Sequence, residues 1–157
     1  MTEKSVGARA MLSRDRAAAA LGMTIRLVEP GRAVISMRIR EDMLNGFDIV
    51  HGGIIFALAD TAFAAACNED ERVTVAAGAD ITFLTSARLG QVLTATAHRR
   101  ALSGRSGLYD VTVTDENDAP IAEFRGRSRV TTRAVSGAAA SAADQAAQHT
   151  SKHATHE

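Results

Sequence analysis

The spacing of apolar and polar residues follows a helical period in some segments of the chain and a strand period in others, and these periods predict its helices and strands. Residues 8–21 are rich in Ala, Leu and Arg, which favour a helix, and Gly22 stands where such a helix would end. Residues 24–29 and 33–39 alternate apolar with polar side chains on either side of the turn sequence Pro30-Gly31-Arg32. The pattern predicts one helix followed by an antiparallel hairpin.

A long apolar run occupies the middle of the chain. Residues 52–66 are apolar at nearly every position, which is typical of a helix packed in a core on most sides. Four strand-like segments follow it: residues 73–84, 92–100, 107–115 and 120–133. This order predicts an α+β fold in which one antiparallel sheet is wrapped around the long central helix. A homodimer with a continuous sheet would cover the sheet edges.

The end of the chain differs in composition. Large apolar side chains are nearly absent after residue 133, so we expect a domain over residues 1–133 and a disordered tail over residues 134–157. His149, His153 and His156 lie in this tail, and the first pair has the i, i+4 spacing of a helical metal site. Because few carboxylate or thiol ligands accompany them, we predict no metal.

Charge and cysteine content narrow the class of protein. Eighteen basic and 18 acidic residues give a formal net charge of zero, so no electrostatic argument favours nucleic acid or an anionic membrane as a partner. Cys67 is the only cysteine, which excludes an intrachain disulfide, and no signal peptide is recognised. The apolar run is too short to span a bilayer. We therefore expect a soluble protein in the cytoplasm.

Asp60 is the one acidic or basic side chain between His51 and Asn68. A buried carboxylate without partners is costly, and Asp is a poor residue in the middle of a helix because its side chain competes for backbone hydrogen bonds. Two interpretations have equal weight on this pattern alone. Asp60 either faces water or pairs with an arginine, or it acts as a general base or nucleophile in a dry pocket.

Two glycines stand at the start of the predicted helix, directly after His51. Backbone N–H groups at a helix N-terminus can bind the oxyanion of a carbonyl under attack, although a plain glycine-rich helix entry is also common. Gly53 and Asp60 lie on one helical face but about 10 Å apart along the axis, so one thioester carbon cannot lie within about 3 Å of both. If both residues act, they come from two chains, which predicts an obligate dimer.

Several other side chains are candidates with structural alternatives of similar weight. Asn45 could orient a water or the substrate carbonyl, or simply form a turn, and His51 could position the glycines or simply precede the helix. Thr61 points about 100° away from Asp60 and is expected to pack. Cys67, at the end of an apolar helix, is expected to pack rather than to act as a nucleophile.

Two basic segments follow in the predicted strands. The turn that contains Arg105, Ser106 and Gly107 could bind a phosphate, and Arg125 and Arg127 alternate along one strand with Arg129. Each arginine alone is more simply a surface residue. Together they would suit a phosphorylated ligand such as coenzyme A. The chain lacks the GxSxG, P-loop, GxGxxG, HExxH and paired CxxC motifs.

The stretch NGFDIVHGGIIFALADTAFAAACN, residues 45–68, resembles the signature of hotdog-fold acyl-CoA thioesterases of the phenylacetate-degradation type, the PaaI-like group. The resemblance extends from about residue 9 to residue 133 and includes RAAAALGM, GRSGLYDV and FRGRSR. It implies a hotdog fold and dimers that pair into tetramers, with active sites at the dimer interface.

The resemblance also implies roles for individual residues. Asp60 matches the catalytic acid, as general base or nucleophile, and Gly53 matches the glycine whose amide polarises the thioester carbonyl. Asn45 matches the residue that places the carbonyl or the lytic water, and His51 the histidine at the helix entry. A Ser or Thr on the strand facing the site is common in relatives, and here Thr74 and Thr82 are its candidates.

The expected reaction is hydrolysis of an aryl-acetyl-CoA, such as phenylacetyl-CoA or a hydroxylated derivative, to free acid and coenzyme A in aromatic degradation. No cofactor is expected, because coenzyme A is part of the substrate. Two alternatives remain open. One is a medium- or long-chain fatty acyl-CoA thioesterase, and the other is a non-catalytic protein that binds acyl-CoA.

Overall fold

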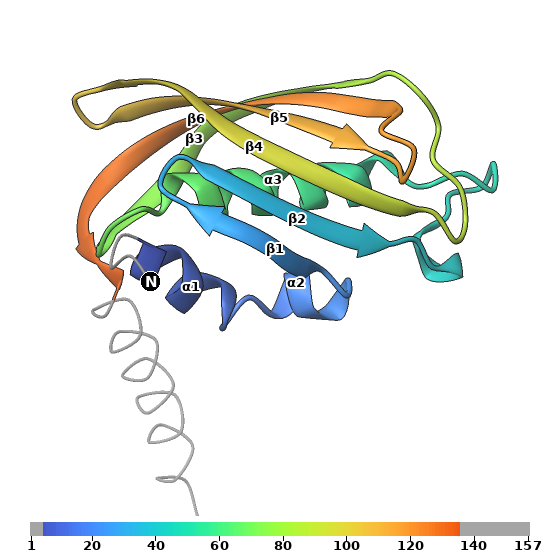
Figure 1. The fold of residues 1–157 in the computed structure, drawn as a ribbon, viewed down its shortest axis with the longest axis horizontal. Coiled ribbons are helices and arrows are strands. Elements are labelled where there is room, and N and C mark those ends of the chain that lie inside the picture. Colours follow the sequence, from blue (N-terminus) through green and yellow to red (C-terminus); the bar gives the residue numbers. More distant parts are fainter. Residues whose placement is uncertain (1–4, 136–157) are drawn as a thin grey trace, which may run out of the picture.

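The structure is a computed structural model that describes residues 5–135. One six-stranded antiparallel sheet curves over the long helix α3 (Gly52–Cys67), and two short helices, α1 (Val6–Leu12) and α2 (Arg16–Ala20), lie beside it (Figure 1). The strands are β1 (Thr24–Glu29), β2 (Arg32–Arg38), β3 (Arg72–Phe83), β4 (Val92–Ser103), β5 (Ser106–Thr114) and β6 (Pro120–Ala134). The predicted α+β architecture, including the hairpin and the central helix, is confirmed.

The strand order is β1-β2-β4-β5-β6-β3, so β1 and β3 form the two edges of the sheet. Side chains alternate between a buried face and an outer face. On β5, for example, Tyr109, Val111 and Val113 are buried, whereas Asp110 and Thr112 lie on the opposite face. The buried face packs on α3, mainly through β2, β4 and β5. This alternation is the period of two expected of a half-buried antiparallel sheet.

Small side chains allow α3 to lie close to the sheet. Leu58, Ala59, Ala62 and Phe63 are fully buried, and a Cβ added to Gly126 of β6 would lie 2.7 Å from the Phe63 ring. The helix is nevertheless not covered all round. One flank is exposed or only half-buried in a single chain, and it consists of Gly53, Phe56, Ala57, Asp60 and Ala64.

The N-terminal region departs from the prediction of a single helix over residues 8–21. It forms α1 and α2 with a break between them, because the Asp15 side chain accepts a hydrogen bond from the backbone N–H of Ala18 at 2.9 Å and starts a new helix. The predicted end is confirmed, since Gly22 has a φ of 68°, which suits glycine.

The C-terminal end of the described chain lies beside the loop before β3. Strand β6 ends at Ala134, and the Val135 N–H donates to the Glu71 carbonyl at 2.7 Å. The tail predicted from residue 134, with its three histidines, lies outside the described residues from residue 136 onward. Within residues 5–135 no helix is long and apolar enough to cross a membrane.

Candidate active site

The loop that leads into α3 is fixed by its own hydrogen bonds. Asn45 Oδ1 accepts from the Phe47 N–H at 2.9 Å, and the Asn45 N–H donates to the Ile49 carbonyl at 2.8 Å. Asp48 has a φ of 57°, a conformation that Asp tolerates better than most residues. The side-chain oxygen of Asn45 is used in this turn. Its Nδ2 group has no hydrogen-bond partner within residues 5–135 and remains available as a donor.

His51 is the N-cap of α3. Its Nδ1 accepts the Gly53 N–H at 3.0 Å, so the ring proton of the neutral imidazole is on Nε2. The Gly53 amide, the predicted donor to the carbonyl, is therefore occupied by His51 in this structure. To donate to a substrate it would have to exchange the imidazole for the substrate oxygen.

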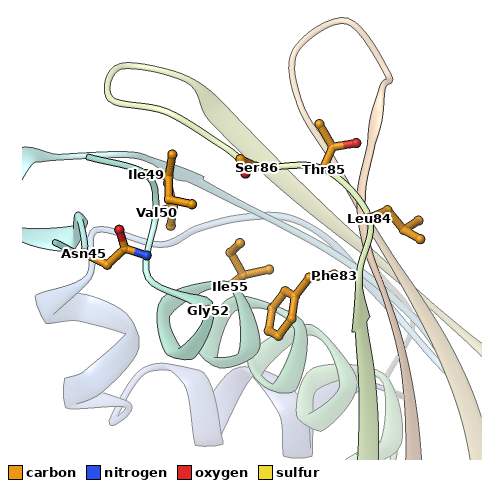
Figure 2. Close-up of a pocket in the computed structure, with 9 residues that line it drawn as sticks. All are labelled: Asn45, Ile49, Val50, Gly52, Ile55, Phe83, Leu84, Thr85 and Ser86. Carbon is orange, nitrogen blue, oxygen red and sulfur yellow. The ribbon is translucent and has the colours of Figure 1, made fainter. Parts of the chain in front are cut away.

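The Gly52 amide is the open donor at the start of the same helix. The Ile54 and Ile55 N–H groups donate to the His51 carbonyl, whereas the Gly52 N–H has no partner in the described part of the chain. Gly52 also lines a cavity of about 260 Å³, together with Asn45, Ile49, Val50, Ile55 and residues 83–86. Figure 2 shows the Phe83 ring next to Gly52, and Asn45 on the opposite side of the cavity.

Asp60 lies further along α3, on its open flank. Its carboxylate is half-buried and makes no hydrogen bond or ion pair with any described residue. Burial raises the pKa of this carboxyl, and the negative charge of Asp15 raises it further. A carboxylate without a partner and with a raised pKa is a suitable general base.

The distance along α3 separates Asp60 from the open amide. The helix runs without a break from Gly52 to Cys67, so Asp60, eight positions after Gly52, lies about 12 Å further along the axis. Asp60 is also not among the residues that line the cavity at Gly52. Within one chain, the Gly52 amide and Asp60 therefore cannot both contact the same reacting carbon.

Apolar side chains surround the open flank of α3. Phe56 is 36% exposed and packs edge-on against Phe124 of β6, with ring centroids 5.3 Å apart. Phe83 of the edge strand β3 is 52% exposed, and its ring lies next to Gly52 at the start of α3. A long edge strand next to an exposed apolar flank is the kind of surface that pairs with another chain.

The five residues predicted to bind coenzyme A lie away from α3. Arg125 and Arg127 project from the outer face of the sheet, where Arg125 forms two hydrogen bonds with Asp110 at 2.7 and 3.0 Å, and Arg127 contacts Asp80 at 2.5 Å. Ser106, Gly107 and Arg127 line a separate cavity of about 370 Å³, together with Arg129. Arg105 lies in the exposed β4–β5 turn. In a single chain the sheet separates this cavity from Asp60.

The remaining candidates have structural contacts. Burial raises the pKa of the Cys67 thiol to about 12, which leaves it neutral and suits a packing role. Thr61 donates to the Ala57 carbonyl at 2.8 Å, and the buried Thr74 backbone is bonded to Asn68. Thr82 pairs with Glu123 on the outer face. No cluster of three metal-ligating side chains occurs within residues 5–135.

Comparison with known proteins identifies the family. Residues 47–122 match the family model of the thioesterase superfamily. The acyl-coenzyme A thioesterase PaaI of Escherichia coli is 40% identical over 130 residues, which cover 83% of this chain and 93% of PaaI. The chain belongs to the thioesterase superfamily. Within it, this chain is a thioesterase of the PaaI type, and the prediction of an acyl-CoA thioesterase is confirmed at the level of the family.

Solved structures agree with this assignment. The PaaI protein from the phenylacetic acid degradation operon of E. coli superimposes with a TM-score of 0.79 over 82% of this chain and 93% of PaaI. A mutant of the phenylacetic acid degradation protein PaaI of Thermus thermophilus, 33% identical, gives a TM-score of 0.70 over 73% of this chain and 98% of its own. The hotdog fold predicted from residues 45–68 is confirmed.

Two residues of this thioesterase were not foreseen from the sequence. The Gly52 amide is open where Gly53 was expected, because the His51 side chain folds back onto the second glycine. The negative charge of Asp15, which is 45 positions away in the chain, adds to the effect of burial in raising the pKa of Asp60. The sequence did carry a sign of Asp15, since an Asp placed before a helix-favouring segment, here Arg16 and four alanines, is a helix N-cap pattern.

Proposed function

We propose that this PaaI-type thioesterase hydrolyses an aryl-acetyl-CoA, such as phenylacetyl-CoA or a hydroxylated derivative, to free acid and coenzyme A in aromatic degradation. The observation that carries the proposal is Asp60, a half-buried carboxylate with no partner among the described residues and a raised pKa. The name of the E. coli relative's operon supports the choice of acyl group.

The proposed active site forms between two chains. The edge strand β3 pairs with β3 of a second copy, and this brings the helix start of one chain next to Asp60 of the other. The exposed residues Phe83 and Phe56 support this arrangement, because pairing would bury them. It also overcomes the separation of about 12 Å between Gly52 and Asp60 within one helix. The resulting dimers would pair into tetramers.

In this site the thioester carbonyl accepts hydrogen bonds from the Gly52 N–H and from the free Nδ2 of Asn45. The positive end of the α3 dipole adds to the stabilisation of the oxyanion. Gly53 becomes a second donor if the His51 imidazole moves aside. Asp60 of the neighbouring chain either removes a proton from water or attacks the carbonyl itself. Single-turnover hydrolysis in ¹⁸O-water separates these routes, because label enters Asp60 only if an anhydride forms.

We propose that the protein acts in the cytoplasm and that its reaction uses no metal. Coenzyme A takes part only as a portion of the substrate, so we propose no separate cofactor. The proposed chemistry needs only a carbonyl binding site and a base, and Asn45, Gly52 and Asp60 supply both. Full activity after treatment with EDTA is the expected result, and restoration of a lost activity by a divalent metal would contradict it.

We propose that the outer-face cavity with Ser106, Gly107 and Arg127 binds the phosphates of coenzyme A. The acyl group of the same substrate molecule would lie in the active site of a neighbouring dimer in the tetramer. Arg105 and Arg125 would lie beside the bound phosphates.

Arg127→Gln is expected to raise KM for the acyl-CoA several-fold, because a charged hydrogen bond to phosphate is lost. KM for the same acyl group on N-acetylcysteamine, which has no phosphate, should not change. Steady-state kinetics on both substrates measure the difference.

Asp80→Asn is the matched control for this prediction. It breaks the same Arg127–Asp80 pair but leaves the arginine charge in the cavity, so KM for the acyl-CoA should not rise. An equal rise of KM in both variants, or an equal rise on both substrates, would contradict phosphate binding at this cavity.

A panel of acyl-CoA thioesters tests the substrate class directly. Release of thiol is measured on phenylacetyl-CoA, its ring-hydroxylated derivatives and a series of fatty acyl-CoA thioesters from short to long chains. The aryl-acetyl compounds are expected to give the highest kcat/KM. Higher values on medium or long fatty chains would replace the proposed substrate, and binding without turnover on every member would contradict hydrolysis.

A further inference from the structure

Phe83 lies where the edge strand β3 meets the start of α3. It is the last residue of β3, and it pairs with the buried Ala122 of β6. Side chains alternate between the two faces of a strand, so Phe83 is on the same face as Ile81, which packs against the core. The ring therefore projects toward α3 and not from the outer face of the sheet.

The Phe83 ring forms one wall of the cavity at Gly52 (Figure 2). A Cβ added to Gly52 would lie 3.0 Å from the Cζ atom of Phe83, so the edge of the ring lies against the residue that carries the open amide. Asn45, the other proposed carbonyl donor, is on the opposite side of the cavity. A carbonyl bound by these two donors would therefore lie next to Phe83.

Phe83 is the one aromatic residue among the described residues that line this cavity. The other apolar lining residues are aliphatic: Ile49, Val50, Ile55 and Leu84. Phe83 is 52% exposed and takes no part in the ring pairs of residues 5–135, which are formed by Phe56, Phe63, Tyr109 and Phe124. Its ring is therefore open to contact with a group that enters the cavity.

We propose that Phe83 is a specificity-determining residue, whose ring contacts the aromatic ring of the acyl group. The inference rests on the proposed function. One methylene separates the ring from the carbonyl in an aryl-acetyl group, so a substrate bound at the Gly52 amide would bring its ring within reach of Phe83. In the proposed dimer the second copy would enclose both rings.

The chemistry of this contact favours an aryl group over a saturated one. Two aromatic rings in edge-on or offset contact attract each other by more than the apolar area they bury. A saturated acyl group of the same size gains only from the burial of its apolar surface. Phe83 would therefore raise kcat/KM for an aryl-acetyl-CoA more than for a saturated analogue.

Phe83→Leu tests the contact, because it removes the ring and keeps a large apolar side chain. The measured quantity is the ratio of kcat/KM for phenylacetyl-CoA to that for cyclohexylacetyl-CoA, whose saturated ring has nearly the same size. The wild type should prefer phenylacetyl-CoA, and Phe83→Leu should lower this ratio by about 2–10-fold. Phe83→Ile, whose β-branched side chain suits a strand, should give the same fall. Partial misfolding lowers both rates equally and does not move the ratio.

Phe47→Leu is the matched control. Phe47 is an exposed aromatic residue of the turn formed by Asn45, and it is not among the residues that line the cavity. The same replacement at this position should leave the ratio unchanged. Phe83→Tyr, which keeps a ring at position 83, should also retain the wild-type ratio. An equal fall in Phe47→Leu and Phe83→Leu would overturn the inference.

The wild type separates a failure of this inference from a failure of the proposed function. If it prefers phenylacetyl-CoA to fatty acyl-CoA thioesters, but Phe83→Leu keeps the full ratio of phenylacetyl-CoA to cyclohexylacetyl-CoA, the inference is overturned and the proposed function stands. If it prefers fatty acyl-CoA thioesters or hydrolyses none of these substrates, the proposed function fails and the inference fails with it.

A crystal structure with a non-hydrolysable phenylacetyl-CoA ether gives a readout that does not depend on turnover. The centroid of the bound phenyl ring should lie about 4.5–7 Å from that of Phe83. A phenyl ring bound out of contact with Phe83 would overturn the inference, even if the carbonyl donors are as proposed.

Discussion

Asp60→Asn is expected to lower kcat on the best acyl-CoA by about 10²–10⁴-fold, the usual effect of removing a general base. Asn has nearly the same shape as Asp, but it can neither take a proton from water nor attack the carbonyl. The carbonyl donors at Asn45 and Gly52 remain, so binding of the substrate should persist. Thiol release measures the loss of turnover, and calorimetry with a non-hydrolysable acyl-CoA ether measures binding.

Asp60→Glu is the control for this variant, because it keeps a carboxylate and displaces it by one methylene. It should retain more activity than Asp60→Asn. If both variants lose the same amount of activity, the altered geometry of the side chain alone would explain the loss. Full activity of Asp60→Asn would rule out both proposed roles of Asp60.

Asp60→Asn is also expected to stabilise the fold at neutral pH. Folding raises the pKa of Asp60, mainly through burial, so the folded state binds this proton more tightly than the unfolded chain does. The contribution to stability is complete below the unfolded pKa, about 3.9, and is lost as the pH rises through the folded pKa. Asp60→Asn removes this loss. Its Tm should exceed that of the wild type at pH 7, and the difference should shrink toward pH 4.

Gly52→Pro is expected to lower kcat by about 10²–10³-fold, the usual effect of removing one oxyanion donor. Proline has no N–H, and the first position of a helix is the one where it is best tolerated. His51, with φ −61° and ψ 130°, already has the extended conformation required before proline. The variant should therefore fold and lose the carbonyl donor.

Gly52→Ala is its matched control. Both variants add a Cβ 3.0 Å from the Cζ atom of Phe83, a half-exposed ring that can move, but alanine keeps the N–H. Gly52→Ala should remain much more active than Gly52→Pro. If the two variants lose equal activity, contact with Phe83 rather than the amide would explain the loss.

The two inactive variants also test whether the site is shared. A dimer of one Asp60→Asn chain and one Gly52→Pro chain contains one site with both defects and one site with neither. Random mixing should therefore restore about a quarter of the wild-type activity, since half of the dimers are mixed and each has one intact site. No recovery after subunit exchange, confirmed by mass spectrometry, would show that each chain uses its own Gly52 and Asp60.

Much of the fold could be predicted from local patterns. The alternation in residues 24–29 and 33–39 indicated the hairpin, and the apolar run that begins at Gly52 indicated α3, because burial on one face or on most faces leaves a period in the sequence. The break between α1 and α2 was missed. Helix propensity is nearly uniform across residues 8–21, and the N-cap bond of Asp15 decides against it.

The site was predictable only in part. Alternation along β6 showed that Arg125 and Arg127 share a face, but not that this face is turned away from α3. That depends on Phe124 and Gly126, which pack on the helix from the other side of the strand. Two adjacent glycines were visible, but the conformation of the His51 side chain decides which amide is open.

The sequence by itself determined the family and the fold class and singled out Asp60 as a candidate catalytic residue, because a carboxylate in an apolar helix and the motif around it are local features of the chain. Only the tertiary structure decided that the Gly52 amide is open and that the arginines of β6 lie on the outer face. These are contacts between side chains and segments whose approach is set by the packing of α1 and α2, the sheet and α3, and no spacing along the chain encodes such a distance.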